Sequence, residues 1–184
     1  MKLNLGCGKK SMNGYLNIDS QNEIGNVELV HDLTDVPYPF AKANEAEEIT
    51  SIEFLEHISF RDTEKVLAEW YRILNYGGKL KIQVPDAGKA MVYYANKEIC
   101  ECVPHKADSV EGFKANPACP KCQGKAKINP RRWIYTFTGA QKHEFDVHRN
   151  HFTHESMIDY LTKAGFKNIT LKEHIHKLIV EATK

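Results

Sequence analysis

The first nineteen residues constrain the fold of this chain more than any other segment. A short apolar run at residues 3–5 leads into Gly6-Cys7-Gly8, and a second run at residues 16–18 ends at Asp19. Glycines allow the backbone to approach a ligand closely, and an acidic residue after the next strand can bind ribose hydroxyls. The pattern predicts a nucleoside site at the carboxyl ends of two strands of an open α/β sheet.

The spacing of this motif indicates which nucleoside is bound. A dinucleotide site needs three glycines opening a helix, whose N-terminus holds the pyrophosphate. Here Ser11 occupies the third glycine position, and residues 9–14 are too few for a helical crossover. Without that helix a pyrophosphate loses its main anchor, whereas S-adenosylmethionine (SAM), which carries adenosine without phosphate, loses much less. We therefore expect SAM rather than NAD.

Two motifs at the N-terminus carry a resemblance to a known family. Residues 3–8 read Leu-Asn-Leu-Gly-Cys-Gly and residues 14–19 read Gly-Tyr-Leu-Asn-Ile-Asp. These resemble class I SAM-dependent methyltransferases, in particular their small bacterial and phage-type members. The resemblance covers about residues 3–86 and 148–182. It implies a Rossmann-like α/β fold with a mostly parallel sheet that closes in a C-terminal antiparallel hairpin.

The resemblance also implies a set of cofactor-binding residues. Residues 27–30 form an apolar run that ends before Asp32 and Leu33, similar to the strand end that faces adenine in this family. Residues 48–56 and the following His57 resemble the fourth strand and its Leu-Glu-His exit beside the methionine moiety. The implied set is Gly6, Cys7, Gly8, Asp19, Asp32, Leu33, Glu53 and His57. For Cys7 we expect steric fit between two glycines rather than nucleophilic chemistry.

Periodicity downstream predicts the remaining elements. Apolar side chains at helical spacing predict a core-facing helix over residues 62–74, with Trp70 and also Phe54 expected in the core. Residues 75–78 are expected to end it, and residues 79–86 alternate as a strand. Thr153 is a predicted helix N-cap, with an end near residues 164–166. Residues 169–173 and 178–182 are expected to form the closing hairpin.

Composition limits the classes of protein to which the chain can belong. With 184 residues, 42% of them hydrophobic, it can bury one core, so we expect a single domain over residues 1–184 with an insert at about residues 87–147. The net charge of +1 gives no global field that would attract nucleic acid or an anionic membrane. No leader peptide or apolar run of membrane-spanning length is present, so we expect a cytoplasmic protein.

The insert holds four of the five cysteines. They form two pairs, Cys100-x-Cys102 and Cys119-x-x-Cys122, with sixteen residues between the pairs. This arrangement resembles a zinc ribbon, in which four thiolates bind one structural zinc ion. In a reducing compartment zinc explains the pairs better than disulfides do. The first pair is unusually close, which leaves His105 as a substitute ligand, and free thiols in a disordered loop are the alternative.

Two further clusters have competing interpretations. Basic residues between Lys121 and Arg132 precede Trp133, a pattern that can bind nucleic acid or a sugar phosphate, although a solvated loop surface is the favoured interpretation. Four histidines gather before the last predicted helix, at positions 143, 148, 151 and 154. Metal binding by them is the less favoured interpretation. The resemblance implies instead a substrate-side role for His148 or His151.

The expected chemistry follows from the cofactor. SAM carries its methyl group on a sulfonium, so the enzyme mainly brings the acceptor to attack distance and excludes water. An oxygen acceptor also benefits from a base, for which Asp86, after the fifth strand, and His148 are the candidates. We expect O- or N-methylation of a small molecule or saccharide, because the small members that the chain resembles often accompany glycan biosynthesis. The alternative is a non-catalytic SAM-fold module whose zinc loop contacts RNA or protein.

Overall fold

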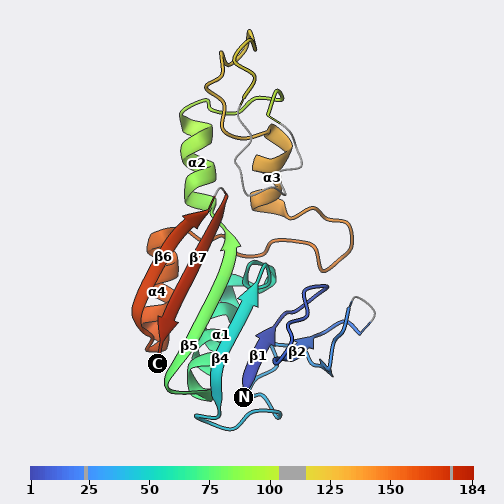
Figure 1. The fold of residues 1–184 in the computed structure, drawn as a ribbon, viewed down its shortest axis with the longest axis vertical. Helices are drawn as coiled ribbons and strands as arrows, with labels where there is room; N and C mark the ends of the chain where they lie inside the picture. Colours follow the sequence, from blue (N-terminus) through green and yellow to red (C-terminus); the bar gives the residue numbers. More distant parts are fainter. Residues whose placement is uncertain (23–24, 104–114, 175) are drawn as a thin grey trace.

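A seven-stranded sheet forms the centre of the molecule. The computed structural model describes residues 1–184 except 23–24, 104–114 and 175 (Figure 1). Its strands are β1 (Lys2–Leu5), β2 (Leu16–Asp19), β3 (Leu29–Val30), β4 (Ala46–Ile52), β5 (Leu74–Pro85), β6 (Lys167–His174) and β7 (Lys177–Thr183). They lie in the order β3-β2-β1-β4-β5-β7-β6. The first five are parallel and β7 is antiparallel to both neighbours, which confirms the predicted mostly parallel sheet with a closing hairpin.

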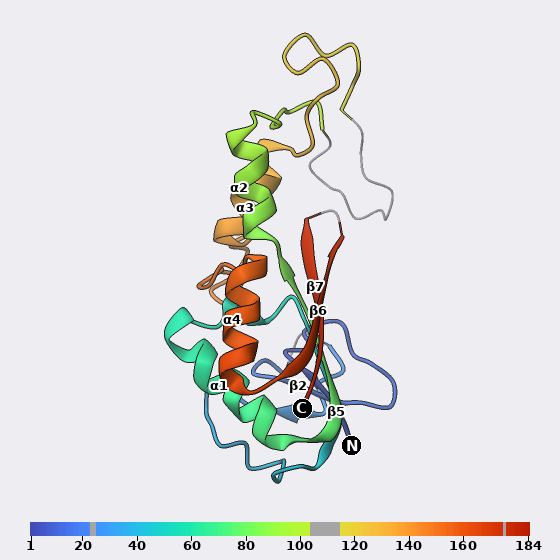
Figure 2. The ribbon, with the colours of Figure 1, turned by 90° about the vertical axis from the view of Figure 1, so that its left-hand side faces the viewer.

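The helices divide into two groups. A 3₁₀ turn, η1 (Leu55–His57), precedes α1 (Phe60–Ile73), and α4 (His154–Ala164) precedes β6. Helices α1 and α4 pack together on one face of the sheet (Figure 2). By contrast, α2 (Ala87–Ala95) and α3 (Pro130–Thr138) lie beyond the carboxyl end of β5 (Figures 1 and 2). Helix α1 and helix α4 confirm the two helices predicted from periodicity and capping.

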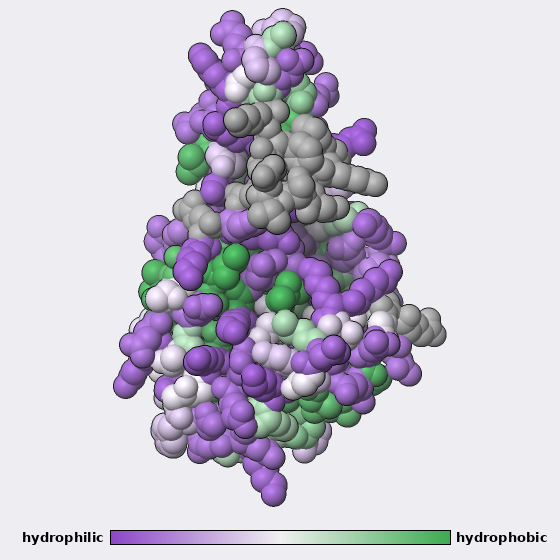
Figure 3. Space-filling view, viewed as in Figure 1, coloured by the Kyte–Doolittle hydropathy of each residue, from purple (hydrophilic) through white to green (hydrophobic). Residues whose placement is uncertain are grey.

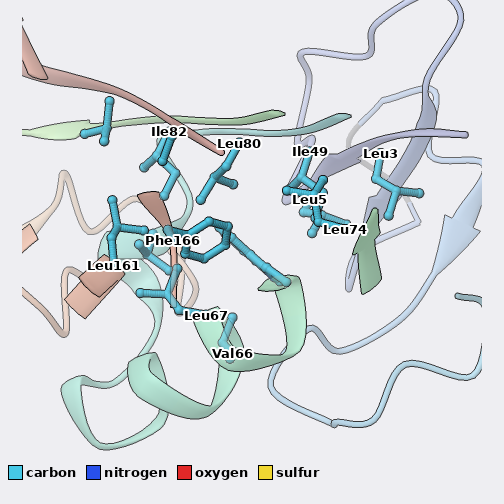
Figure 4. Packing of buried hydrophobic residues seen from close by; sticks show 14 of the residues in the cluster. Leu3, Leu5, Ile49, Val66, Leu67, Leu74, Leu80, Ile82, Leu161 and Phe166 are labelled. Atoms are coloured by element: carbon cyan, nitrogen blue, oxygen red, sulfur yellow. The ribbon is translucent and has the colours of Figure 1, made fainter. Parts of the chain in front are cut away.

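The core lies between the sheet and the pair α1 and α4. Alternate residues of β1, β4 and β5 project toward the helices, because successive strand side chains point to opposite faces. Among them are Leu3, Ile49 and Leu80, which belong to the same buried cluster as Leu67 and Leu161 of the helices (Figure 4). Trp70 is completely buried, and its indole Nε1 donates a hydrogen bond to the Tyr38 hydroxyl at 3.0 Å. This single apolar layer unites the N-terminal and C-terminal strands.

The opposite face of the sheet is polar. Glu48 on β4 lies 2.8 Å from the Lys81 ammonium and 3.5 Å from that of Lys2, so the row across β1, β4 and β5 is charged. The surface on this side of the molecule is largely hydrophilic (Figure 3). The described residues between β1 and β4 form no helix. Parallel sheets usually carry helices on both faces, so this sheet is unusual in having a polar face on which the described residues between β1 and β4 place no helix.

Strand β5 begins earlier than predicted. Residues 75–78 were expected to end the helix and to precede the strand; helix α1 does end before them, but they lie within the strand, and Leu74 pairs with Ala46 of β4. The register between β4 and β5 shifts after Ala46, and Gly77 has a left-handed φ of 76°. A bulge of this kind accommodates the extra residues and the left-handed glycine while the strand continues beyond them. None of the helices in the described part of the chain combines the length and apolar character needed to cross a membrane.

Reciprocal side-chain contacts fix the start of α4. The Thr153 hydroxyl accepts a hydrogen bond from the Ser156 amide at 3.2 Å, and the Ser156 hydroxyl accepts one from the Thr153 amide at 2.9 Å. This capping box satisfies two backbone donors that a helix start otherwise leaves free. The helix ends at Gly165, whose φ of 102° is favourable only for glycine.

We expect Thr153→Ala to lower the free energy of unfolding by about 1 kcal/mol, because the cap is lost. Urea denaturation followed by circular dichroism measures this change. Thr162→Ala is the matched control, since Thr162 is an exposed threonine in the body of the same helix. Equal destabilisation by the two variants would contradict a specific capping role.

Candidate functional site

A cavity of about 460 Å³ lies at the carboxyl ends of β1, β2 and β4. Its volume is in the range typical of small-molecule and cofactor sites. In open α/β sheets such sites form where neighbouring strands connect in opposite directions, here between β1 and β4. The predicted cofactor residues that line it are Gly6, Gly8, Asp19, Asp32, Leu33, Glu53 and His57.

The glycine loop forms the floor of this cavity. Gly6 has a φ of 71°, and a Cβ placed there would lie 2.0 Å from the Phe54 ring, so no other residue fits. The Gly8 amide donates a hydrogen bond to the Asp19 carboxylate at 2.9 Å, and the Gln21 amide donates another at 3.1 Å. These bonds fix the carboxylate at the cavity wall. Phe54, assigned to the core by sequence, packs against the core and also lines the cavity.

Cys7 lies behind the glycine loop rather than in the cavity. Its side chain is 3% exposed, and it is absent from the cavity lining. Burial, together with the charge of Asp19, raises the pKa of the Cys7 thiol to about 11. The thiol therefore stays neutral near pH 7, which favours a packing role over a nucleophilic one.

Asp32 occupies the wall formed after β3. The Thr34 amide and hydroxyl donate hydrogen bonds to one Asp32 oxygen at 2.9 and 2.8 Å. The bond from the Thr34 amide is the main cause that lowers the pKa of Asp32. The carboxylate is therefore ionised near pH 7 and held in a fixed orientation at the cavity wall.

The opposite wall comes from residues 143–149, which the sequence did not assign to the cofactor. His143, Phe145, Asp146 and Arg149 all line the cavity. Backbone bonds anchor this segment on η1: the Arg149 and Asn150 amides donate to the Glu56 carbonyl at 2.8 and 3.1 Å. No local sequence pattern predicts such a contact between segments some ninety positions apart.

A second cavity of about 140 Å³ adjoins the first. Glu53 and Asp146 line both, and His148 and His176 line the smaller one only. Glu53 has a left-handed φ of 57°, a strained conformation for a non-glycine residue and one that clusters at functional sites. Its carboxylate is held by the Lys177 ammonium at 3.3 Å and by the Gln83 amide at 3.3 Å.

The two base candidates have different surroundings. His148 donates from Nδ1 to the Thr136 carbonyl at 2.9 Å, and burial, with a further contribution from His57, lowers its pKa below the usual value. Asp86 lines neither cavity described above. It is 2% exposed, and its Oδ1 accepts a bond from the Lys89 amide at 2.8 Å as the N-cap of α2. Only His148 is therefore adjacent to a space that a substrate can enter.

The four histidines near the last helix are not one cluster. His143 lines the larger cavity and His148 the smaller one. The His151 ring packs edge-on against Phe137, with ring centroids 5.5 Å apart. His154 lies beside the buried cap residue Asp86, with Nε2 3.7 Å from the carboxylate.

The four insert cysteines converge. Their sulfur atoms all lie within 4.8 Å of one another, with Cys100 to Cys119 at 3.7 Å and Cys102 to Cys122 at 3.4 Å. These separations are too long for disulfides and are close to the roughly 3.8 Å expected between thiolates about 2.3 Å from a tetrahedral zinc. Burial opposes ionisation of Cys122, but bonds from the Ala126 amide and from Cys102 lower its pKa to about 6. The substitute ligand His105 lies outside the described residues.

The basic and the aromatic residues of the insert lie in different parts of it. Trp133 on α3 stacks on Tyr94 of α2 at 4.8 Å, and its Nε1 donates to the Ala90 carbonyl at 3.1 Å. This aromatic contact therefore joins the two helices. The lysines surround a different feature, a surface hollow of about 550 Å³ next to Cys122. It is lined by Lys97, Lys121, Lys125 and Lys127, among others.

Comparisons with known proteins support the fold. No protein-family model and no curated protein matches this chain. Among solved structures, a SAM-dependent methyltransferase of Thermotoga maritima matches all of this chain and 81% of its own, with TM-score 0.60 and 14% identity. One from Methanosarcina mazei matches all of this chain and 91% of its own, with TM-score 0.59 and 17% identity. Human N-acetylserotonin methyltransferase was solved in complex with SAM. The alignment covers all of this chain and 47% of the human protein, with TM-score 0.52 and 14% identity.

The chain thus has the fold of the class I SAM-dependent methyltransferases. The strand order and the antiparallel β7 agree with the fold that the N-terminal motifs predicted. At 14% and 17% sequence identity, the similarity to these two structures is one of fold.

We expect Gly6→Ala to lower the free energy of unfolding by about 1–3 kcal/mol more than Gly8→Ala does. Both residues have positive φ, but a Cβ at Gly8 meets no atom within 4 Å, whereas one at Gly6 meets Phe54. Urea denaturation of both variants isolates this steric difference. Equal destabilisation would show that the close approach of Phe54 does not constrain position 6.

Proposed function

We propose that this chain is a SAM-dependent methyltransferase that binds SAM in the larger cavity. One observation carries the proposal: the left-handed glycine loop, with the Gly8 amide bonded to Asp19, opens into a cavity of nucleoside size. The methyltransferases of the same fold support methyl transfer in general. Residues 6–15, all of which the structure describes, form no helix after the glycine loop, which argues against a pyrophosphate and hence against NAD.

The cofactor residues take the following roles in this proposal. Asp19 binds the ribose hydroxyls, because its carboxylate is oriented by two backbone amides. Asp32 and Leu33 contact adenine on the neighbouring wall. Gly6 and Gly8 supply the backbone floor, and Cys7 between them packs away from the cavity. Glu53 and His57 lie on the methionine side, where the negative charge of Glu53 favours a sulfonium cation.

The acceptor binds in the smaller cavity, which shares Glu53 with the larger one. Methyl transfer needs the acceptor atom in line with the sulfonium and needs water to be excluded. The limited volume of this cavity favours a small molecule or one residue of a saccharide, methylated on oxygen or nitrogen. We propose that His148 acts on the acceptor side, and that Asp86 acts only through the start of α2.

We further propose that Cys100, Cys102, Cys119 and Cys122 bind one structural zinc ion. Four thiols at these separations match a closed tetrahedral site. Among the described residues of this loop, the apolar side chains packed with the cysteines are the small ones of Val103, Ala115 and Ala126, whose burial contributes little stability. Metal binding would supply the missing folding free energy.

The alternative function is a non-catalytic module whose zinc loop contacts RNA or protein. The lysine-lined hollow beside Cys122 favours this candidate, because such a surface attracts phosphates. Incubation with SAM labelled on the methyl group distinguishes the two functions. A catalytic protein labels a saccharide or a small hydroxyl or amine acceptor, whereas the module binds RNA and labels nothing.

Titration calorimetry should detect binding of SAM and of its demethylated product, and no binding of NAD. Asp19→Ala should weaken SAM binding by about 1–3 kcal/mol, because hydrogen bonds to a charged group are lost. Asp35→Ala is the matched control, since this exposed aspartate lies near the cavity without lining it. Binding of NAD without SAM would refute the proposed cofactor.

Elemental analysis of the purified protein should find about one zinc ion per chain. Cys119→Ser should remove the zinc, because three thiolates leave the tetrahedral site incomplete. Cys7→Ala should retain it, since Cys7 lies apart from the cluster in the glycine loop. A zinc-free wild-type protein whose insert keeps its protection from proteolysis would overturn this proposal.

A further inference from the structure

We propose a second metal site, in which Glu56, His57 and His148 bind a divalent transition-metal ion. One ligand atom from each of these side chains lies within 4.8 Å of the other two. His57 lines the larger cavity and His148 lines the smaller one, so the cluster lies where the two cavities meet. It is separate from the four cysteines of the insert.

Both histidines are oriented as metal ligands are. Nδ1 of His57 lies 3.1 Å from the Val147 carbonyl, and Nδ1 of His148 lies 2.9 Å from the Thr136 carbonyl. A carbonyl only accepts, so each Nδ1 must carry the proton and each Nε2 keeps its lone pair. Metal-bound histidines nearly always donate their other ring N–H in this way, which fixes the ring and its tautomer.

The buried side chain of Glu56 provides independent evidence for a bound cation at this cluster. Its side chain is 2% exposed, and its Oε2 has no hydrogen-bond partner among the residues that the structure describes. Burying an unsatisfied carboxylate is costly unless a cation or a donor is present. The neighbouring Glu53 is already paired with Lys177 and Gln83, so it is outside the proposed ligand set.

The backbone holds the three ligands in a fixed arrangement. The Glu56 carbonyl accepts bonds from the Arg149 and Asn150 amides, which docks the segment carrying His148 onto η1. The two imidazoles meet edge to face, with centroids 5.1 Å apart. Two imidazoles and one carboxylate leave coordination positions open and suit ions such as Mn²⁺, Fe²⁺, Co²⁺ and Zn²⁺.

The site has a consequence that rests on the proposed methyltransferase function. An acceptor hydroxyl bound to the ion at an open position ionises more readily and releases its proton to solvent. The resulting oxyanion forms a bond to the methyl carbon as the bond from that carbon to sulfur breaks, and the sulfonium becomes a thioether. In this arrangement His148 assists the acceptor through the metal rather than as a free base.

The test uses Mn²⁺, which prefers oxygen and imidazole ligands and competes poorly for four thiolates. The full-length protein, with its zinc content measured beforehand, is titrated with Mn²⁺ alone, and the free ion is followed by electron paramagnetic resonance. We expect about one Mn²⁺ per chain. Glu56→Gln and His148→Ala should each weaken binding by at least about 100-fold, more than the loss of an outer-shell partner.

His151→Ala is the matched control, because His151 lies three residues from His148 but contacts Phe137 instead. Wild-type protein that binds no Mn²⁺, or Glu56→Gln that binds it unchanged, would overturn the site. If His148→Ala does not fold, the isosteric Glu56→Gln still decides the question. A separate SAM titration of the same samples distinguishes failure of the metal site from failure of the proposed cofactor.

Discussion

The parallel pairing of β1 with β4 is the constraint on which the rest of the structure depends. Leu3 lies opposite Ile49 although more than forty residues separate them, and the chain then turns from β1 toward β2 and from β4 toward β5. The connections that leave the two strands therefore run in opposite directions, and a cavity lies between them at the carboxyl ends. A Cβ at Gly6, after β1, would overlap the ring of Phe54, after β4, which explains why position 6 must be glycine.

The molecule is stabilised by the apolar layer between the sheet and two helices, and elsewhere by ion pairs and aromatic contacts. Helices α1 and α4 cover one face of the sheet, while the other carries ion pairs such as that of Glu48 with Lys81. Beyond the sheet, α2 and α3 are joined through Trp133 and Tyr94 and are topped by the cysteine cluster. The stacked rings hold α2 against α3, and the proposed zinc ion would stabilise the loop that carries the cysteines.

Docking of residues 147–150 onto η1 unites the two halves of the candidate site. The backbone of Glu56 accepts two hydrogen bonds there, and the His57 ring donates a third to the Val147 carbonyl. The same contact closes the larger cavity with residues 143–149 and brings His148 beside His57. The proposed cofactor site, acceptor site and second metal site thus share one structural element.

Features that depend on neighbouring residues were predictable from the sequence: the glycine loop, the polar and apolar alternation of β5, the cap at Thr153 and the spacing of the cysteines. It also contained caps for α2 and α3, at Asp86 and Asn129, although the segment between them shows no periodic apolar pattern. Only the tertiary structure decided that Asp86 is a buried helix cap, that Phe54 lines the cavity and that Glu56 and His57 meet His148. The physical reason is that these contacts join segments far apart in the chain, and their geometry depends on the path of the backbone between them rather than on any local pattern.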